Sequence, residues 1–312
     1  MSEVSQKPAT KEIKLFTTPL TGLVVIMLIE RISRPAFIVL ICFGFCLSSC
    51  SSLITAAIQP AIGNLQQQTN IDLVCTGTPA YLLMIDSMLV SSPENRGLLL
   101  TGVQSFSAYA TALEECADAD DPRIAPVADK AKLYGLRLLR HYLPLDAGQN
   151  YELLDHRLAK LDRSDVPDVF WGTFGWLTWI KGQQGSPEAV ADMVEIEKIM
   201  ARLLELDESY QAGAIHLFFG SYYAAKPAML GGRPDLSKLH FEKALLLARH
   251  RFLLTQTTYA ETLARTTLDQ KLHDRLLHEV LAFPLDSAPE FGLSNQIAVS
   301  RAKRLLKENY FN

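Results

Sequence analysis

Apolar residues recur every three or four positions along most of the chain, and this spacing constrains the fold most. In residues 187–206 one helical stripe takes in Ala189, Val190, Met193, Ile196, Met200, Leu203 and Leu204. Ser186 and Pro187 mark its start, because a serine oxygen accepts an unpaired N–H and a proline has none to pair. No run of alternating β-branched residues is long enough for a strand. We therefore predict an all-α fold, with helices of about 12–20 residues across residues 53–308.

The last predicted helix covers about residues 288–308. Ser287 and Glu290 stand three positions apart, which is the spacing of a capping box, in which each side chain bonds the other residue's backbone N–H. We therefore expect Ser287 to cap this helix. Antiparallel helix pairs joined by short turns predict a bundle or superhelix.

An apolar run from Pro35 to Leu47 follows Arg31 and Arg34 and ends in Leu47-Ser48-Ser49-Cys50. A basic region, a short apolar region and small residues before a cleavage point are the parts of a secretory signal. The ending resembles the signal of bacterial lipoproteins, in which the cysteine receives lipid and becomes the mature N-terminus. The run is short for a membrane span, which needs roughly 20 apolar residues. A buried core helix or a plain membrane anchor is the alternative.

The residues from Met27 to Arg34 form a basic region of the kind that begins a secretory signal. The additional apolar stretch from Leu20 to Ile29 is not part of such a signal. We therefore expect translation to start at Met27. The predicted organisation is a signal region 1–49, in which 1–26 precede the true start and 27–49 are the lipoprotein signal peptide, followed by a mature helical domain 50–312.

The charge balance argues against one class of partner. The net charge is −4 and lysine and arginine form no stripe, so nothing favours nucleic acid. Of the five cysteines, Cys42 and Cys46 lie in the signal and Cys50 would carry lipid. Cys75 and Cys116 remain, and they form either a disulfide in an oxidising compartment or two buried thiols.

One helix pair matches the tetratricopeptide pattern, which places a bulky residue, Leu-Gly and Tyr on one helix and Ala, Phe and Ala on the next. His216, Phe219-Gly220 and Tyr223 match the first helix, with His in place of Trp, and Phe241 is a candidate for the second. Gly220 has no side chain and so lets the second helix pack closely. Poorer matches elsewhere indicate degenerate repeats.

Several strings then follow one another in a recognisable order. They are Pro79-Ala80-Tyr81, Ser92-Pro93-Glu94-Asn95, Trp171-Gly172 with Gly175-Trp176, Leu203 to His216, Gly231-Gly232-Arg233-Pro234, His240 to Ala244, and Leu293 to Arg301. In this order the chain resembles the T component of TRAP-transporter-associated systems, the TatT family of periplasmic lipoproteins. The resemblance covers residues 55–311 and is most specific from Leu203 to Ala244.

The resemblance implies a periplasmic helical protein of tetratricopeptide-like pairs that can form a homotrimer, with a channel through each protomer. It also implies association with a DctP-type periplasmic solute-binding protein, which captures organic acids or other small, sometimes hydrophobic, ligands for the transporter. Ser51, directly after the predicted lipid site, is not acidic. By resemblance to lipoprotein sorting in Gram-negative cells, this favours the outer membrane.

Trp171, Trp176 and Trp179 lie close together in the sequence, with Phe170 and Phe174 among them. On a helix turning about 100° per residue, Phe170, Trp171 and Phe174 face one side, and Trp176 and Trp179 face the other. These side chains could line a channel for an apolar ligand, since aromatic residues dominate ligand pockets. Core packing between repeats is the simpler interpretation.

His216, Phe219, Tyr222 and Tyr223 form a second aromatic group. A hydrogen-bonded core histidine is the simpler interpretation of His216, and a proton- or ligand-binding histidine is the alternative. Asn295 lies among apolar neighbours, where a buried amide usually bonds nearby backbone, so we expect it to dock a loop. With the tryptophans, these residues are our candidate contacts to a ligand channel or a partner.

An acidic run consists of Glu114, Glu115, Asp118, Asp120 and Asp121. Paired carboxylates can perform general acid–base catalysis, but no histidine or nucleophile stands nearby, so we expect a solvated turn. His273 and His278, five apart, do not share a helix face as metal ligands would. We therefore predict no enzyme, no metal and no cofactor apart from the lipid on Cys50.

We interpret the chain as a lipid-anchored periplasmic accessory protein of a TRAP-type transport system that docks a DctP-type binding protein and passes or shields a small, hydrophobic ligand. Two other classes stay open. A general tetratricopeptide scaffold lipoprotein in outer-membrane or envelope assembly would have a solid core around Trp171 and Trp176. An enzyme acting on envelope polymers would need a cleft with perturbed carboxylates.

Overall fold

A computed structural model describes residues 63–117, 121–145, 151–183, 185–225 and 231–311. These ranges contain helices and turns and no strand, so the predicted all-α fold is confirmed. They all belong to one compact unit. The predicted start at Met27, the signal peptide and the lipid site Cys50 lie outside the described residues.

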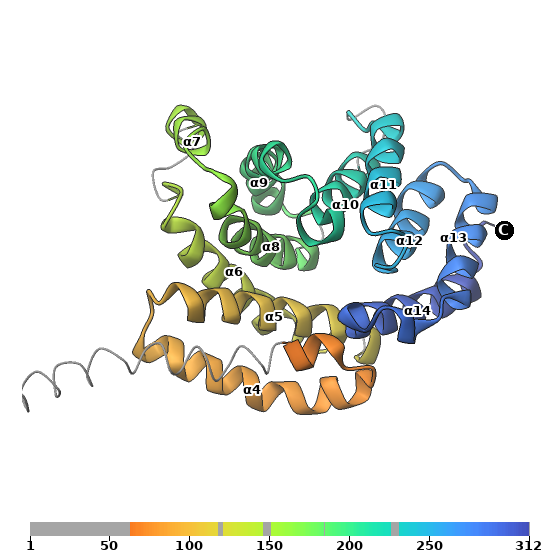
Figure 1. Cartoon of the computed structure of the whole chain (residues 1–312), viewed down its shortest axis with the longest axis horizontal. Coiled ribbons are helices and arrows are strands. Elements are labelled where there is room, and N and C mark those ends of the chain that lie inside the picture. Colours follow the sequence, from red (N-terminus) through yellow and green to blue (C-terminus); the bar gives the residue numbers. More distant parts are fainter. Residues whose placement is uncertain (1–62, 118–120, 146–150, 184, 226–230, 312) are drawn as a thin grey trace, which may run out of the picture. The chain divides into compact units, whose positions relative to one another are not determined.

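A short helical segment at residues 63–67 precedes the numbered helices of Figure 1. The α-helices are α4 (Ile71–Ser91), α5 (Arg96–Cys116), α6 (Ile124–Arg140), α7 (Tyr151–Leu158), α8 (Val166–Gly182), α9 (Pro187–Leu206), α10 (Tyr210–Ala225), α11 (Pro234–Leu247), α12 (Leu254–Tyr259), α13 (Gln270–Ala282) and α14 (Gly292–Lys307). The remaining segments are the 3-10 turns η1 (Arg163–Asp165), η4 (Leu285–Ser287) and η5 (Pro289–Phe291) and the π-helix η3 (Ala260–Ala264).

Side-chain caps start several of these helices. The Ser186 hydroxyl accepts the backbone N–H of Ala189 at 3.3 Å, and α9 then covers residues 187–206 as predicted. Asn70 and Asn95 cap α4 and α5 in the same way, each at 3.0 Å. Such a cap supplies a partner to one of the four unpaired N–H groups at a helix start.

The predicted capping box at Ser287 is wrong. The Ser287 hydroxyl donates to the backbone oxygen of Pro284, the residue before η4, and Glu290 pairs with Arg251 at 2.8 Å. Helix α14 begins only at Gly292 and has no side-chain cap. A Cβ on Gly292 would lie 2.7 Å from the backbone oxygen of Gln67. Tight packing against the first described turn therefore accompanies this helix start, and the local capping pattern does not set it.

Glycines bring two helix pairs into unusually close contact. A Cβ on Gly135 of α6 would lie 2.5 Å from the backbone oxygen of Gly172 of α8, and one on Gly175 would lie equally close to the oxygen of Ala131. In α10, a Cβ on Gly220 would lie 2.9 Å from the ring of Phe241 in α11. The predicted close packing at Gly220 is therefore confirmed.

The end of the helix array returns to its beginning, because α14 contacts α5 and α4 (Figure 1). Val74, Ala112, Leu293 and Ile297 form a small apolar cluster at this junction. The Cys75–Cys116 disulfide ties α4 to α5 at the same place. Of the two alternatives for these cysteines, the structure thus has the disulfide.

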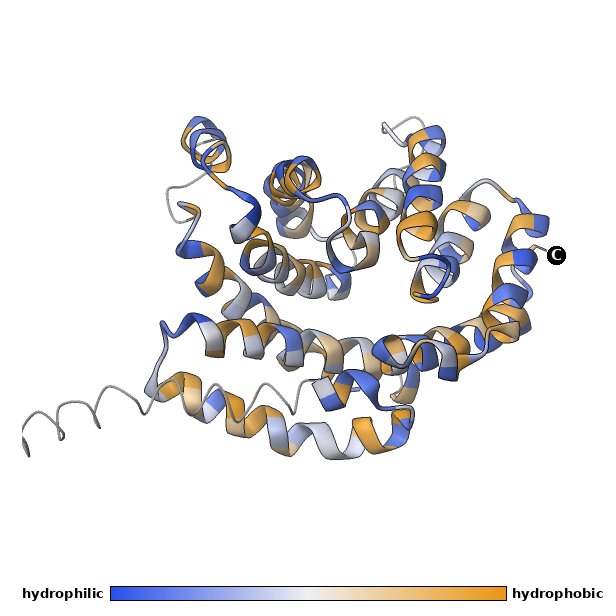
Figure 2. Cartoon of the chain, viewed as in Figure 1, coloured by the Kyte–Doolittle hydropathy of each residue, from blue (hydrophilic) through white to orange (hydrophobic). Residues whose placement is uncertain are grey.

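Figure 2 shows how apolar and polar residues are distributed over the helices, with the two kinds alternating around each turn of α14. Among the described helices, α4 is long and apolar enough to cross a membrane, judged by length and composition only. Its residues Leu82, Ile85 and Leu89 are buried in a core cluster shared with α5 and α6. Packing therefore accounts for part of the apolar character of α4, whereas Leu83 and Val90 of the same helix are 68% and 78% exposed.

Candidate functional site

Helix α10 carries the second aromatic group, and an unusual turn sets its direction. Gln211, Ala212 and Gly213 have φ values of 47°, 56° and 81°, so three consecutive residues are left-handed. Two of them have side chains, for which this conformation is costly. A Cβ on Gly213 would lie 3.1 Å from Leu247 of α11. The turn thus brings α10 against α11 at close range.

His216, one turn further along α10, is 5% exposed and bonded through both ring nitrogens. Its Nδ1 lies 2.8 Å from Nδ1 of His240 on α11, and its Nε2 lies 3.2 Å from the Glu208 carboxylate. Burial lowers the pKa of His216, although Glu208 opposes that shift. Burial and the charge of His216 lower the pKa of His240 to about 4. Neutral imidazoles therefore dominate at neutral pH.

The sequence did not single out His240 as a site residue, although the string around it supports the family resemblance. Its ring centroid lies 5.2 Å from Phe219 and 5.7 Å from Tyr223, whose rings stack on each other at 5.9 Å. The predicted aromatic group is therefore one packed cluster that includes a residue from α11. His240 directly precedes Phe241, the predicted tetratricopeptide anchor, and this position could have indicated that His240 lies at the α10–α11 contact.

The Tyr222 hydroxyl donates a short hydrogen bond to the Glu197 carboxylate of α9. Burial and then the hydrogen bond to Glu197 raise the pKa of Tyr222, so its hydroxyl stays protonated. Tyr222 and Phe219 are 9% and 4% exposed, whereas Tyr223 is half-buried. Of the aromatic side chains in this group, Tyr223 therefore offers the most surface to a partner.

The aromatic residues of α8 divide between two sides of the helix, as their spacing predicts. Phe170, Trp171 and Phe174 contact one another at centroid distances of 5.5 to 5.9 Å. The ring of Tyr210, at the start of α10, lies 5.1 Å from Phe170. Trp171 is half-buried, so this side packs α8 against α10 and leaves part of one indole accessible.

Trp176 and Trp179 lie on the other side, 4% and 8% exposed. The Trp176 indole N–H donates to Asp192 of α9 at 2.6 Å. The Lys132 ammonium of α6 lies 3.2 Å from the Trp179 ring centroid and 3.2 Å from the Asp192 carboxylate. A cation over an indole face is attracted by the ring quadrupole. These two tryptophans therefore join α6, α8 and α9 within the fold.

Asn295, in α14, is 1% exposed. Its side-chain oxygen accepts the backbone N–H of Leu253 at 2.9 Å, and its side-chain N–H donates to the carbonyl of Arg251 at 2.9 Å. The amide thus fixes the segment before α12, which is the loop-docking geometry expected from the sequence.

The predicted solvated turn at the acidic run is wrong for Glu115, and Glu114, although exposed, lies in α5 and is ion-paired. The Glu115 side chain is 2% exposed and accepts a hydrogen bond from Nε of Arg301 at 3.2 Å. Glu114 accepts from Nη2 of Arg301 at 2.7 Å and from Lys181 at 2.6 Å. Asp121 pairs with the neighbouring Arg123. Asp118 and Asp120 lie outside the described residues.

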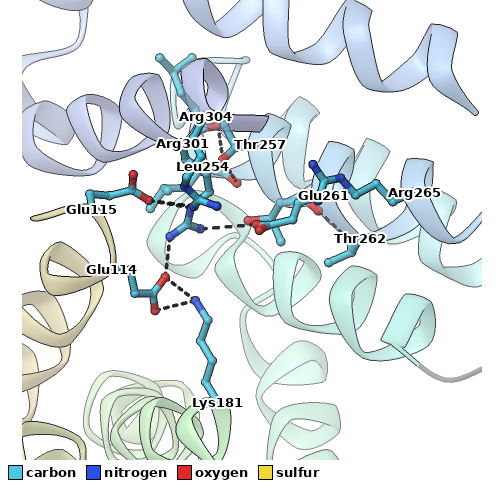
Figure 3. Close-up of polar contacts among 12 residues, drawn as sticks. Glu114, Glu115, Lys181, Leu254, Thr257, Glu261, Thr262, Arg265, Arg301 and Arg304 are labelled. Carbon is cyan, nitrogen blue, oxygen red and sulfur yellow. Dashed lines mark hydrogen bonds and ion pairs between the residues drawn. The ribbon is translucent and has the colours of Figure 1, made fainter. Parts of the chain in front are cut away.

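Figure 3 shows Arg301 of α14 pointing between carboxylates from two other elements. Glu114 and Glu115 come from the end of α5, and Glu261, 4.0 Å away, comes from the π-helix η3. Buried charges are tolerated when they are paired and hydrogen-bonded. The sequence did not indicate a role for Arg301, because its partners Glu114 and Glu115 lie 187 and 186 positions away.

In the described part of the chain, no group of three or more His, Cys, Asp or Glu side chains is placed to hold a metal ion. The polar groups above bond to one another and leave no nucleophile beside a free base. Two open surface hollows lie along α14, at Ser300 to Glu308, and beside the start of α4, at Asn64 to Tyr81. The arrangement of the candidate residues therefore suits packing and binding.

Comparison with known proteins gives a clear family. The model of the TRAP transporter T-component family matches residues 67–311. An uncharacterised protein of Treponema pallidum (strain Nichols) is 24% identical over 257 residues, covering 77% of this chain and 79% of the relative.

Proposed function

The chain belongs to the TRAP transporter T-component family and functions with a TRAP transport system. On that premise we propose that it is a lipid-anchored periplasmic accessory protein that docks a DctP-type solute-binding protein. The family match over residues 67–311 is the observation that carries this proposal. It agrees with the helical fold and with the accessory, non-enzymatic role of a transporter component. A homotrimer is part of the proposal.

The proposed location is the periplasmic side of the envelope. The Cys75–Cys116 disulfide supports it, because disulfides persist in oxidising compartments and are rare in the cytosol. The anchor is a lipid on Cys50, and no other cofactor is proposed. Several acyl chains, each contributing about 0.8 kcal/mol per buried methylene, hold such a protein firmly on a membrane.

Cell fractionation tests the anchor. Cys50→Ser is expected to move the protein from the membrane fraction to the soluble fraction, whereas Cys46→Ser, within the same signal, leaves it on the membrane. Ser51→Asp is expected to shift it from the outer to the inner membrane. A Cys50→Ser protein that fractionates with membranes as wild type does would refute the lipid anchor.

The proposed docking surface is the α10–α11 pair around the half-buried Tyr223 and the exposed Leu239. Half-buried Trp171 extends this surface on α8, because Phe170 links it to the first residue of α10. Phe219 and Tyr222 support the surface from within the fold. The small, hydrophobic ligand would pass between the two proteins beside the aromatic side chains of this surface.

Affinity capture from solubilised membranes with a tagged, lipidated chain tests docking. Mass spectrometry is expected to find a periplasmic solute-binding protein, and Tyr223→Ala combined with Leu239→Ala to reduce its recovery. Tyr310→Ala is the matched control, because Tyr310 is a partly exposed tyrosine at the far end of the chain. Recovery of a binding protein that is unaffected by the α10–α11 variant would refute this docking surface.

One observation favours the scaffold function as a second candidate. Trp176 is buried in a core cluster with Val169, Ile196 and Leu203, and a solid core around this residue is what a scaffold without a ligand channel requires. The same capture experiment separates the two functions. Envelope-assembly proteins in place of a binding protein would favour the scaffold and refute the transport role.

A further inference from the structure

The hydrogen bond between His216 and His240 has a property that no other polar contact between α10 and α11 has in the described residues: both of its ends are imidazoles, whose unperturbed pKa lies near physiological pH. Its two Nδ1 atoms are 2.8 Å apart, and the ring centroids are 5.0 Å apart. His216 is 5% exposed and His240 is half-buried. The docking proposal uses neither ring.

Few charged groups face this pair. Glu208, from the connection before α10, bonds His216, and Lys243 of α11 lies 3.6 Å from Glu208. Helix α10 itself contributes the ring of Tyr223. The carboxylates of the neighbouring elements have other partners: Glu197 of α9 is bonded by Tyr222, and Glu261 of η3 faces Arg301. One carboxylate therefore meets two imidazoles.

Whether the His216–His240 hydrogen bond can form depends on how many protons the two rings carry. In the neutral pair, His216 donates from Nε2 to Glu208 and accepts at Nδ1 from the Nδ1–H of His240. One added proton is accommodated, because His216 then donates from both nitrogens while His240 moves its own proton to Nε2 and accepts. A second added proton leaves two N–H groups facing each other and two positive charges on adjacent rings, so the hydrogen bond is lost.

The neighbouring backbone gives this loss a structural consequence. The left-handed residues Gln211, Ala212 and Gly213 lie one turn before His216. Sparsely populated backbone conformations persist only where surrounding contacts hold them. When the pair separates, the contacts that hold the start of α10 against α11 near this turn are reduced to apolar packing and the Glu208–Lys243 ion pair.

We propose that His216 and His240 form a proton-operated clasp, which holds the left-handed turn and the first half of α10 against α11 and opens when both rings are protonated. The clasp is independent of the proposed docking function. It would make this part of the molecule respond to acidification of the compartment in which the protein works.

The direction of the pH dependence follows from the lowered pKa values. Burial lowers the pKa of both rings, and that of His240 to about 4. A histidine freed from the fold has a pKa near 6.5, so acid favours the opened form, which binds more protons. The clasp is therefore closed at neutral pH and weakens as the pH falls below about 6.5.

Hydrogen–deuterium exchange of the full chain at about pH 7.5 and about pH 4.5, corrected for intrinsic exchange rates, tests the clasp. Peptides covering residues 210–217 are expected to lose about tenfold in protection on acidification, relative to peptides of α6. In His240→Gln, whose amide does not titrate, this selective loss is expected to disappear. His278→Gln, which changes an exposed histidine of α13, should behave as wild type.

Two results would overturn the clasp. One is wild-type protein in which residues 210–217 lose no more protection than α6. The other is a folded His240→Gln protein that keeps the full selective loss. If His240→Gln fails to fold, His216→Gln takes its place. The wild-type comparison of α10 with α6 decides the matter even if neither variant folds.

Discussion

Among single residues, Glu195 of α9 lies in surroundings that disfavour its ionised form. Burial raises the pKa of Glu195, and the nearby Asp192 raises it further. A carboxyl whose pKa is higher folded than unfolded stabilises the fold below its unfolded pKa of about 4.3, and this contribution is lost as the pH rises through the folded pKa. At neutral pH, ionised Glu195 therefore lowers stability.

We accordingly expect Glu195→Gln to raise the urea midpoint of unfolding at about pH 7 and to lose that advantage at about pH 4. Glu205→Gln, which changes an exposed carboxylate of the same helix, should give no such gain at either pH. Equal midpoints for Glu195→Gln and wild type at pH 7 would contradict the raised pKa.

A second residue-scale prediction concerns Arg301. Arg301→Met removes a main partner of buried Glu115 and leaves it to Arg304 at 3.4 Å. Breaking a buried ion pair by removing one partner costs about 3 kcal/mol or more of unfolding free energy, which chemical denaturation would measure. Arg275→Met breaks an exposed pair within α13 and should cost at most about 0.5 kcal/mol.

A second substitution at this site distinguishes the effect of the unpaired Glu115 charge on stability from the effect of lost packing. Glu115→Gln in the Arg301→Met background removes the unpaired buried charge and should recover part of the lost stability. An Arg301→Met protein as stable as the Arg275→Met protein would show that the buried network contributes nothing to the fold.

At the scale of elements, sequence reasoning succeeded where the cause was local. Ser186 and Pro187 predicted the start of α9, and Gly220 predicted a close helix contact, because each depends on residues a few positions away or on the absence of a side chain. The start of α14 could not be predicted in this way. Its position involves the packing of Gly292 against Gln67, and no local pattern reports a contact over that separation.

The same limit explains the candidate site. The aromatic residues of α8 and α10 were found because they cluster in sequence. The pairing of His216 with His240, and of Glu115 with Arg301, depends on which helices become neighbours. A single sequence contains the residues for these pairs but not the register that brings them together.

The crossing of α6 and α8 supplies the element-scale prediction. Gly175→Ala places a methyl group 2.5 Å from the backbone oxygen of Ala131, so the helices must separate. Overpacking of this kind costs about 1–3 kcal/mol. Gly182→Ala is a matched control on the same helix, because its Cβ would meet nothing within 4 Å, and alanine favours a helix by up to about 1 kcal/mol.

Thermal and chemical unfolding of the two glycine variants should therefore move in opposite directions. A Gly175→Ala protein with unchanged stability would mean that α6 and α8 can separate without losing contacts.

At the scale of the whole described unit, the Cys75–Cys116 disulfide closes a loop with a sequence separation of 41. In the chain-entropy account, a loop of this length stabilises the fold by about 4 kcal/mol. We expect reductant to lower the unfolding free energy of wild type by an amount of this order. A Cys75→Ser, Cys116→Ser double variant should already be less stable and should not respond to reductant, and a response equal to that of wild type would contradict this disulfide.

The return of α14 to α4 and α5 has a mechanical consequence. Open arrays of helical repeats contact only their neighbours, so they can bend and stretch like a spring by small changes at every interface. Here Arg301, Leu293 and Ile297 join the last helix to the first ones, and extension must rupture that junction before the array can lengthen. A force applied between an N-terminal tether and a partner docked on α10–α11 would therefore meet a closed array that lengthens only after this junction breaks.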